Sequence, residues 1–168
     1  MEWYVICVES NNEERVRNYI EYILHDLDIA YSILIPKREL VERRKGVNKK
    51  VLKCLFPGYI FVNTPQIVDF YYGVKVIPSI HKFLMSDGMF LKVEEAEIEQ
   101  LYLLLNCEGV AVFSEGRLVG ERVIIERGPL CRCTQNVVKI DKRKKRAKIA
   151  IQLAKKVIHV QLGLDVRT

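Results

Sequence analysis

The sequence predicts an α+β protein with two modules: an antiparallel sheet flanked by helices, then a small β-barrel. Three observations carry this prediction. Strand-like and helix-like apolar patterns take turns over roughly the first hundred residues. Helix signals then largely vanish, and short apolar runs separated by turn residues follow. The charge changes as well. Residues 1–116 hold 13 Lys+Arg and 17 Asp+Glu, a net of −4, whereas residues 117–168 hold 14 and 4, a net of +10.

The first module is predicted to start with a strand and an amphipathic helix. Ser10 and Glu13 have the spacing of a capping box, in which each side chain satisfies a backbone amide at the helix start. Apolar residues at helical spacing follow. The elements expected in order are a strand over 3–8, a helix over 13–27, a strand over 30–36, an exposed basic hairpin or loop over 37–50, a strand over 59–62, a short helix over 66–72, a strand over 76–84 and a helix over 94–105.

The strand over 59–62 has apolar residues on both of its faces. Pro57-Gly58 forms a turn in front of it. Alternation places Tyr59 and Phe61 on one face and Ile60 and Val62 on the other. Periodicity favours a central core strand, but two aromatic rings side by side also suit a docking surface for a partner.

The second module is predicted to consist of short strands. They are expected over 123–125, 137–140, 147–153 and 157–162, separated by Gly128-Pro129, Asp141-Lys142 and Gly163. This pattern suits a small barrel. The predicted division is a first domain over 1–107, a linker over 108–117 and a second domain over 118–168.

Catalytic and metal chemistry find little support in the sequence. Cys131 and Cys133 have neither the spacing nor the second ligand pair of a structural zinc site, and only His159 lies in the same module. No glycine-rich phosphate loop or nucleophile–base arrangement stands out. We therefore expect no catalytic activity, no cofactor and no metal. A small thiol or metal enzyme remains an alternative interpretation of the sequence.

The sequence also bears on localisation and oligomeric state. No apolar run is long enough to cross a membrane, and the N-terminal residues lack the order of a signal peptide. Five cysteines without an export signal indicate reduced thiols. The sequence therefore predicts a cytoplasmic protein that makes no membrane contact, and we expect a monomer.

The strongest local signal is a cationic turn between two apolar runs. Seven of the ten residues in 139–148 are Lys or Arg. Such a turn can bind phosphates, or it can be a solvated tip that protects strand edges. RNA is favoured over DNA because no recognition helix for a major groove is evident. A second basic tip, with Arg43, Arg44 and Lys45, is either solvated or touches nucleic-acid phosphates.

Both modules resemble known domains. Trp3-Tyr4-Val5-Ile6 and the stretch 56–62 resemble the N-terminal domain of NusG-family transcription elongation factors. Residues 120–125, 128–130 and 138–141 resemble their C-terminal KOW domain. The Gly-Pro-Leu opening, the basic turn and the closing residues 162–166 look most like the LoaP subgroup of specialised antiterminators.

The resemblance implies partners for each domain. The N-terminal domain would dock on the clamp helices of RNA polymerase, through Cys7, Tyr59 and Phe61. Phe70 and Tyr71 stand where some relatives contact the polymerase gate loop. A five-stranded SH3-like barrel would recruit a second partner, which is Rho or a ribosomal protein for general NusG and a nascent RNA hairpin for LoaP-like members.

These observations predict a processive antiterminator that binds polymerase and leader RNA. The rivals are a general NusG factor and a ribosome-associated RNA-binding protein. DNA near the upstream fork is a further candidate partner of Arg43, Arg44 and Lys45. The candidate RNA-binding residues are Arg132, Lys139, Lys142, Arg143, Lys144, Lys145, Arg146 and Lys148.

Overall fold

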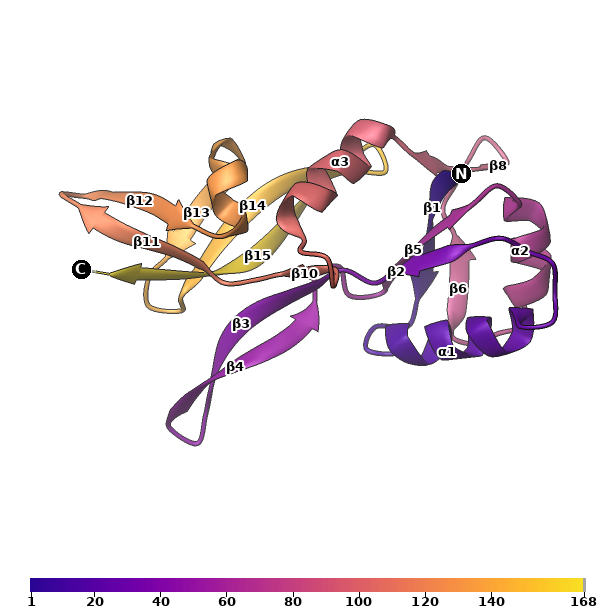
Figure 1. The fold of residues 1–168 in the computed structure, drawn as a ribbon, viewed down its shortest axis with the longest axis horizontal. Coiled ribbons are helices and arrows are strands. Elements are labelled where there is room, and N and C mark those ends of the chain that lie inside the picture. The colour runs from indigo at the N-terminus through magenta and orange to yellow at the C-terminus, as the bar shows by residue number, and fades with distance from the viewer. Residues whose placement is uncertain (168) are drawn as a thin grey trace. The chain divides into compact units, whose positions relative to one another are not determined.

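A computed structural model describes residues 1–167, which form a mixed α/β chain (Figure 1). The chain divides into two compact units. Unit 1 comprises residues 1–35 and 56–95, and unit 2 comprises residues 36–55 and those from 96 onward. Among the described residues, no helix combines the length and the apolar character that a membrane span needs.

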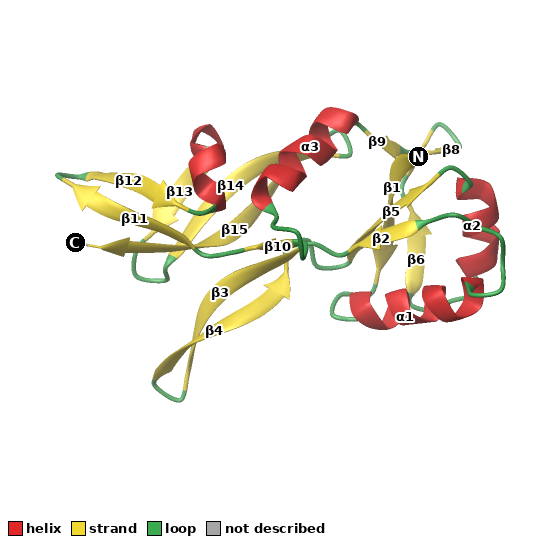
Figure 2. Cartoon of the chain, in the orientation of Figure 1, coloured by secondary structure: helices red, strands yellow, loops and turns green. Residues whose placement is uncertain are grey.

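Unit 1 is built on an antiparallel sheet with the strand order β2-β5-β1-β6, and β9 also pairs with β1. Figure 2 shows its two helices beside the strands. The elements are β1 (Glu2–Val8), α1 (Glu13–Leu24), β2 (Ser32–Leu34), β5 (Tyr59–Thr64), α2 (Ile67–Val74), β6 (Ile80–Phe83), β7 (Met85–Ser86), β8 (Met89–Phe90) and β9 (Lys92–Val93). The predicted order of strands and helices in this part of the chain is confirmed, with shifted ends.

The start of α1 differs from the predicted capping box. The N-cap residue is Asn12, and it makes no side-chain capping bond. Glu13 is buried instead, and its carboxylate accepts a hydrogen bond of 2.6 Å from the backbone N–H of Gly58. Gly58 has a φ of +85°, which favours glycine. Glu13 therefore fixes the turn that leads into β5, and a local motif could not reveal this partner 45 residues away.

Both faces of β5 are covered, as its apolar pattern predicted. Ile60, Phe61 and Val62 are completely buried. The Phe56 ring packs on Phe61 with 5.6 Å between the centroids. On the helix side, α1 buries Val16 and its apolar stripe against the sheet.

Unit 2 contains a five-stranded sheet, a basic hairpin and one helix. The sheet order is β12-β11-β15-β14-β13, and β11 and β15 are parallel. A second sheet has the order β10-β3-β4. The elements are β3 (Lys37–Arg44), β4 (Val47–Cys54), α3 (Glu95–Leu104), β10 (Val110–Ala111), β11 (Ser114–Val119), β12 (Arg122–Arg127), the 3-10 turns Pro129–Arg132 and Thr134–Asn136, β13 (Val137–Asp141), β14 (Arg146–Leu153) and β15 (Lys156–Arg167).

The described structure groups the chain differently from the predicted division into residues 1–107, a linker and residues 118–168. The predicted linker, residues 108–117, is too apolar to be a free segment, and it contains β10 and the start of β11. Val110, Ala111 and Ser114 are buried. The hairpin of β3 and β4 and nearly all of α3 belong to unit 2. Several apolar side chains of these segments are buried by packing within unit 2.

Helix α3 is tied to the β14–β15 turn by a buried carboxylate. Glu97 accepts hydrogen bonds from the backbone N–H groups of Ala154 and Lys155, at 3.1 and 3.2 Å. Both turn residues have positive φ values, which suit a two-residue hairpin turn. Gln100 also accepts a bond from the backbone N–H of Gln152 at 3.2 Å.

Candidate nucleic-acid interface

The two structural units differ in charge more than the two sequence modules do. Unit 1 holds 5 Lys+Arg and 11 Asp+Glu, a net of −6, and unit 2 holds 22 and 10, a net of +12. The difference arises mainly because the hairpin, residues 36–55, joins unit 2 with eight cations and two carboxylates. A strongly basic unit points to a polyanionic partner.

The β3–β4 hairpin contacts strand β15 of the five-stranded sheet at a glycine. An added Cβ on Gly163 would lie 2.3 Å from the Phe113 ring and 2.6 Å from the backbone oxygen of Glu39. Glu39 also accepts a bond of 2.8 Å from the backbone N–H of Phe113. The missing side chain therefore allows β3 to approach β15 closely. Figure 1 shows the β3–β4 hairpin projecting away from the strands of the five-stranded sheet.

Two arginines beside this contact share one glutamine. Arg38 donates to the backbone oxygen of Gln161 at 2.7 Å, and Arg146 donates to the Gln161 side-chain oxygen at 3.0 Å. The Nε atoms of both arginines are buried and have no hydrogen-bond partner among the described residues. Burial lowers the pKa of Arg38 from its ordinary value, and the neighbouring charge of Arg146 lowers it further.

The β13–β14 turn has a fixed backbone and exposed cations. Asp141 accepts a 2.9 Å bond from the backbone N–H of Lys144, and Leu164 donates to the backbone oxygen of Lys145 at 3.0 Å. The Lys145 ammonium pairs with Asp165 at 2.9 Å. Arg143 and Lys144 are exposed and make no ion pair within residues 1–167. The turn therefore presents exposed cations without ion pairs on a backbone that hydrogen bonds hold in one conformation.

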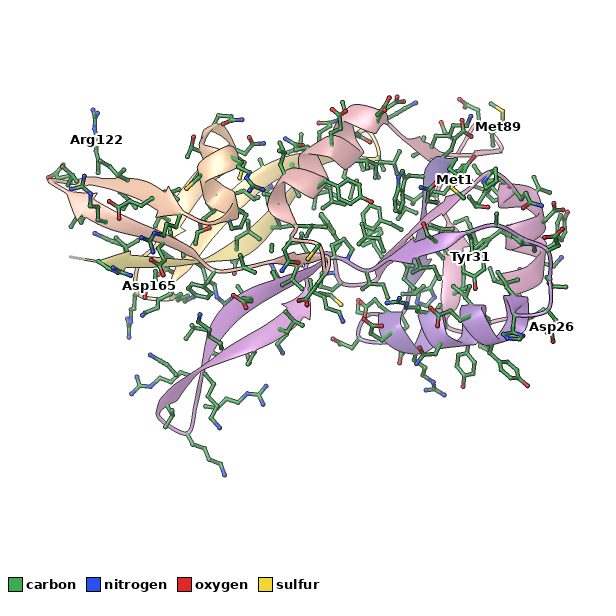
Figure 3. The ribbon with its side chains drawn as sticks, in the orientation of Figure 1. Met1, Asp26, Tyr31, Met89, Arg122 and Asp165 are labelled. Atoms are coloured by element: carbon green, nitrogen blue, oxygen red, sulfur yellow. The ribbon has the colours of Figure 1, made fainter. Side chains whose placement is uncertain are left out.

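The hairpin and the turn line one cleft of about 680 Å³, which we call the basic cleft. Its volume lies in the range of ligand pockets. Figure 3 shows nitrogen-ended side chains around the hairpin, and it marks Asp165 on β15. The lining residues are Val41, Glu42, Arg43, Gly46 and Asn48 from the hairpin and Arg143, Lys144, Lys145 and Arg146 from the turn.

The only carboxylate that lines the basic cleft is already engaged with cations of the hairpin. Glu42 pairs with Arg44 at 3.3 Å and with Lys53 at 3.5 Å. Burial alone would raise the pKa of Glu42, but Lys53 and Arg44 lower it below its ordinary value. The carboxylate stays ionised at neutral pH, and its ion pairs are with Arg44 and Lys53 and not with Arg43.

The structure brings most, but not all, of the predicted RNA-binding residues together. Arg143 to Arg146 line the basic cleft. Lys139 and Lys148 are exposed cross-strand partners, so two like charges lie opposite each other. Lys139 and Lys142 line a separate hollow of about 370 Å³. Arg132 stands apart from the turn cluster, because its guanidinium donates to the backbone oxygen of Leu103 at the end of α3.

The predicted polymerase-docking set is only partly accessible. Phe61 and Phe70 are completely buried, so the sequence-based placement of these two rings on a docking surface needs correction. Phe61 is covered by Phe56. Cys7 and Tyr59 are paired in register on neighbouring strands and are half-buried.

Tyr71, the last of the predicted docking residues, is also half-buried. Its ring packs against Phe83 and Phe90, with centroid separations of 5.2 and 5.4 Å. The neighbouring Tyr72 is 60% exposed, with Lys75 over its ring at 4.3 Å. The more accessible aromatic ring of α2 is therefore one position later than the sequence indicated.

Sequence reasoning missed the residues that join the two basic tips. Arg38 and Gln161 carried no local signal, because their contact joins residues 123 positions apart. Gly163 was recognised only as a turn residue, and its contacts with Phe113 and Glu39 were missed. The basic tip with Arg43 was recognised, but as a separate element. No cluster of three or more His, Cys, Asp or Glu that could bind a metal occurs in residues 1–167.

Comparison with known proteins identifies the family of the chain. The family model described as "Transcription termination factor nusG" matches residues 1–102. The chain belongs to the NusG family. A NusG transcription termination/antitermination protein of Rickettsia prowazekii is 31% identical over 98% of this chain and 88% of its own length. The corresponding protein of Helicobacter pylori strain J99 is 25% identical over 91% and 89%.

A solved structure of the NusG family has the same fold. The structure titled "Domain interaction in Thermotoga maritima NusG" matches with a TM-score of 0.58 and 22% identity, and it covers 96% of this chain and 93% of its own. NusG-family proteins are transcription termination and antitermination factors and are generally not enzymes. The expectation of a NusG-like transcription factor is confirmed at this level.

Proposed function

We propose that this NusG-family chain is a specialised antitermination factor of the LoaP type. Unit 1 would bind the clamp helices of RNA polymerase, and the β13–β14 turn of unit 2 would bind a hairpin in the nascent leader transcript. Holding both partners raises the effective concentration of each contact. The five-stranded sheet would act as a KOW domain of the SH3-like barrel type, and the factor would work as a monomer.

The observation that carries this proposal is the division of charge and surface between the units. Unit 2 has a net charge of +12, and its exposed cations Arg143 and Lys144 stand on a turn with a fixed backbone. Unit 1 has a net charge of −6, which disfavours contact with a polyanion. A general NusG factor that binds Rho or a ribosomal protein would not need this concentration of cations.

The RNA contact is tested by reversing charges on the turn. The triple variant Lys142→Glu, Arg143→Glu and Lys144→Glu changes exposed residues only. The matched control, Arg122→Glu, Arg127→Glu and Lys156→Glu, changes the net charge equally on exposed positions elsewhere in unit 2. We expect the turn variant to lose binding to leader-transcript RNA and to flatten its salt dependence, while the control keeps most of both.

Equal losses in the two triple variants would indicate only a general effect of net charge and would refute the turn as the RNA site. Retained affinity of the turn variant would do so directly. In that case the proteins captured by the wild-type chain would decide between the alternatives. Capture of core polymerase together with Rho or ribosomal proteins would favour a general NusG factor. Capture of ribosomal proteins without core polymerase would favour the ribosome-associated protein.

The polymerase contact is tested at the accessible pair of Cys7 and Tyr59. Cys7→Ser with Tyr59→Ala leaves the buried rings of β5 in place, so the fold of unit 1 should be kept. We expect weaker capture of core RNA polymerase and unchanged RNA binding. Normal polymerase capture by the folded double variant would place the docking surface elsewhere, for which Tyr72→Ala on α2 is the next test.

A further inference from the structure

The two basic tips of unit 2 are not independent features. The β3–β4 hairpin supplies Arg43 to one wall of the basic cleft, and the β13–β14 turn supplies Arg143 to Arg146 to the other. The walls are about 100 residues apart in the sequence. They are held together by the contact at Gly163 and by the bonds of Arg38 and Arg146 to Gln161.

The cleft brings like charges together without a balancing acid. Five of its nine lining residues are Lys or Arg, and its one carboxylate is paired with Arg44 and Lys53. Lys145 has a partner in Asp165, but Arg43, Arg143 and Lys144 have no ion pair within residues 1–167. Such an arrangement repels itself unless an anion occupies it.

Two arginines at or beside the cleft also have unused hydrogen-bond donors. Arg146 lines the cleft, and its Nε is buried without a partner among the described residues. The neighbouring Arg38 has the same deficit. A buried donor without an acceptor costs stability, and a guanidinium without a carboxylate is a preferred partner of phosphate. The backbone around Gly46 leaves space, because an added Cβ there would meet no atom within 4 Å.

We propose that the basic cleft is a single two-walled site that holds the phosphodiester backbone of one RNA strand between the β3–β4 hairpin and the β13–β14 turn. The inference rests on the proposed function, since it takes RNA as the ligand of the turn, and it adds the hairpin as the second half of that site. Arg43 is then an RNA contact and not a separate DNA contact. Sequence specificity would come from bases outside the cleft, because phosphate contacts alone carry none.

The experiment measures binding of the full chain to a labelled stem-loop RNA of about 20 nucleotides, over salt concentrations from about 0.05 to 0.25 M. Arg43→Ala changes the hairpin wall and Arg143→Ala changes the turn wall. Arg122→Ala is the control, because Arg122 is also an exposed cation of unit 2 and does not line the cleft; Figure 3 labels it.

The expected loss follows from counterion release. Each lost phosphate contact lowers the salt slope by about 0.7 for a single strand and about 0.9 for a duplex, which is about fivefold to eightfold in affinity at about 0.1 M salt. We expect Arg43→Ala and Arg143→Ala each to show this loss, and Arg122→Ala to stay within about twofold of the wild type. The amides of Gly46 and Asn48 should also shift on titration with RNA, since both residues line the hairpin wall.

The outcomes separate this inference from the proposed function. If Arg143→Ala weakens RNA binding and Arg43→Ala behaves like Arg122→Ala, the turn binds RNA alone and the two-walled site is wrong. If neither variant differs from the control, both proposals fail. Loss of binding to duplex DNA, but not to RNA, in Arg43→Ala would also overturn the inference, because the hairpin would then be the separate DNA contact.

Discussion

The close approach of the hairpin to the five-stranded sheet predicts that Gly163→Ala is destabilising although it adds only one methyl group. Gly163 has no positive φ, so the cost would not come from its backbone conformation. It would come from the added Cβ, which would lie 2.3 Å from the Phe113 ring and 2.6 Å from the backbone oxygen of Glu39. The ring can turn aside, but the oxygen moves only if strand β3 moves.

The magnitude follows from these two contacts. Overpacking of a well-packed site costs typically about 1–3 kcal/mol, and a backbone neighbour places this case in the upper half of that range. A loss of about 2 kcal/mol lowers the melting temperature by about 4–8 °C for a chain of this size. The displaced strand would also strain the 2.7 Å bond from Arg38 to the backbone oxygen of Gln161.

Thermal unfolding followed by circular dichroism measures the overall loss, and amide hydrogen exchange locates it. Faster exchange should appear at Phe113, whose N–H donates to Glu39, and along β3. Gly73→Ala is the matched control. Its added Cβ would meet only the terminal Cδ2 atom of the Leu24 side chain at 2.6 Å, with no backbone atom in the way, and a helical alanine gains about 1 kcal/mol over glycine. A Gly163→Ala chain as stable as the control variant, with unchanged exchange at Phe113, would refute the packing of β3 on β15.

Three further predictions concern single buried groups. Glu97→Ala should destabilise unit 2 by about 3 kcal/mol in chemical denaturation, because two backbone N–H donors lose their carboxylate acceptor. Glu97→Gln should cost about half as much, because one side-chain oxygen remains as an acceptor. Burial, followed by the neighbouring Cys131, raises the pKa of Cys133 to about 11. Iodoacetamide at about pH 8 should therefore alkylate Cys133 more than tenfold more slowly than the exposed Cys107 and Cys131, as read by mass spectrometry, and equal rates would mean that the site around Cys133 opens. Burial, followed by its hydrogen bond to Glu2, raises the pKa of Tyr4 from 10.0 to about 12. The contribution of Tyr4 to the free energy of unfolding should therefore be complete below pH 10 and lost as the pH rises toward 12. Tyr4→Phe should remove this decline, as measured by urea midpoints.

Local periodicity was sufficient for most of the secondary structure. The alternation in residues 59–62 and the helical spacing after Glu13 are properties of neighbouring residues, so strand β5 and helix α1 could be predicted from them. The basic tips could be recognised for the same reason, because each is a continuous run of cations. What each run faces could not be predicted from its own composition.

The failures involve packing partners that the local pattern does not identify. Glu13 has the spacing of a capping residue, but its carboxylate binds the amide of Gly58. Phe61 has the alternation of a surface ring beside Tyr59, but Phe56 covers it. Gly163 has the sequence pattern of a turn glycine, but its structural role is to leave space for the close approach of residues 39 and 113. Such pairings depend on the tertiary fold and leave no periodic trace.

The charge of the hairpin gives the packing at Gly163 a functional meaning. Residues 36–55 carry eight cations and two carboxylates, and they are packed against a part of the chain that is itself basic. This arrangement raises the repulsion within unit 2 and so lowers its stability. A hairpin with no role could remain solvated at less cost, yet this one is held in place by a glycine contact, by the Glu39–Phe113 bond and by Arg38. A polyanion between the walls would lower this repulsion, so the packing of the hairpin is consistent with the proposed two-walled RNA site.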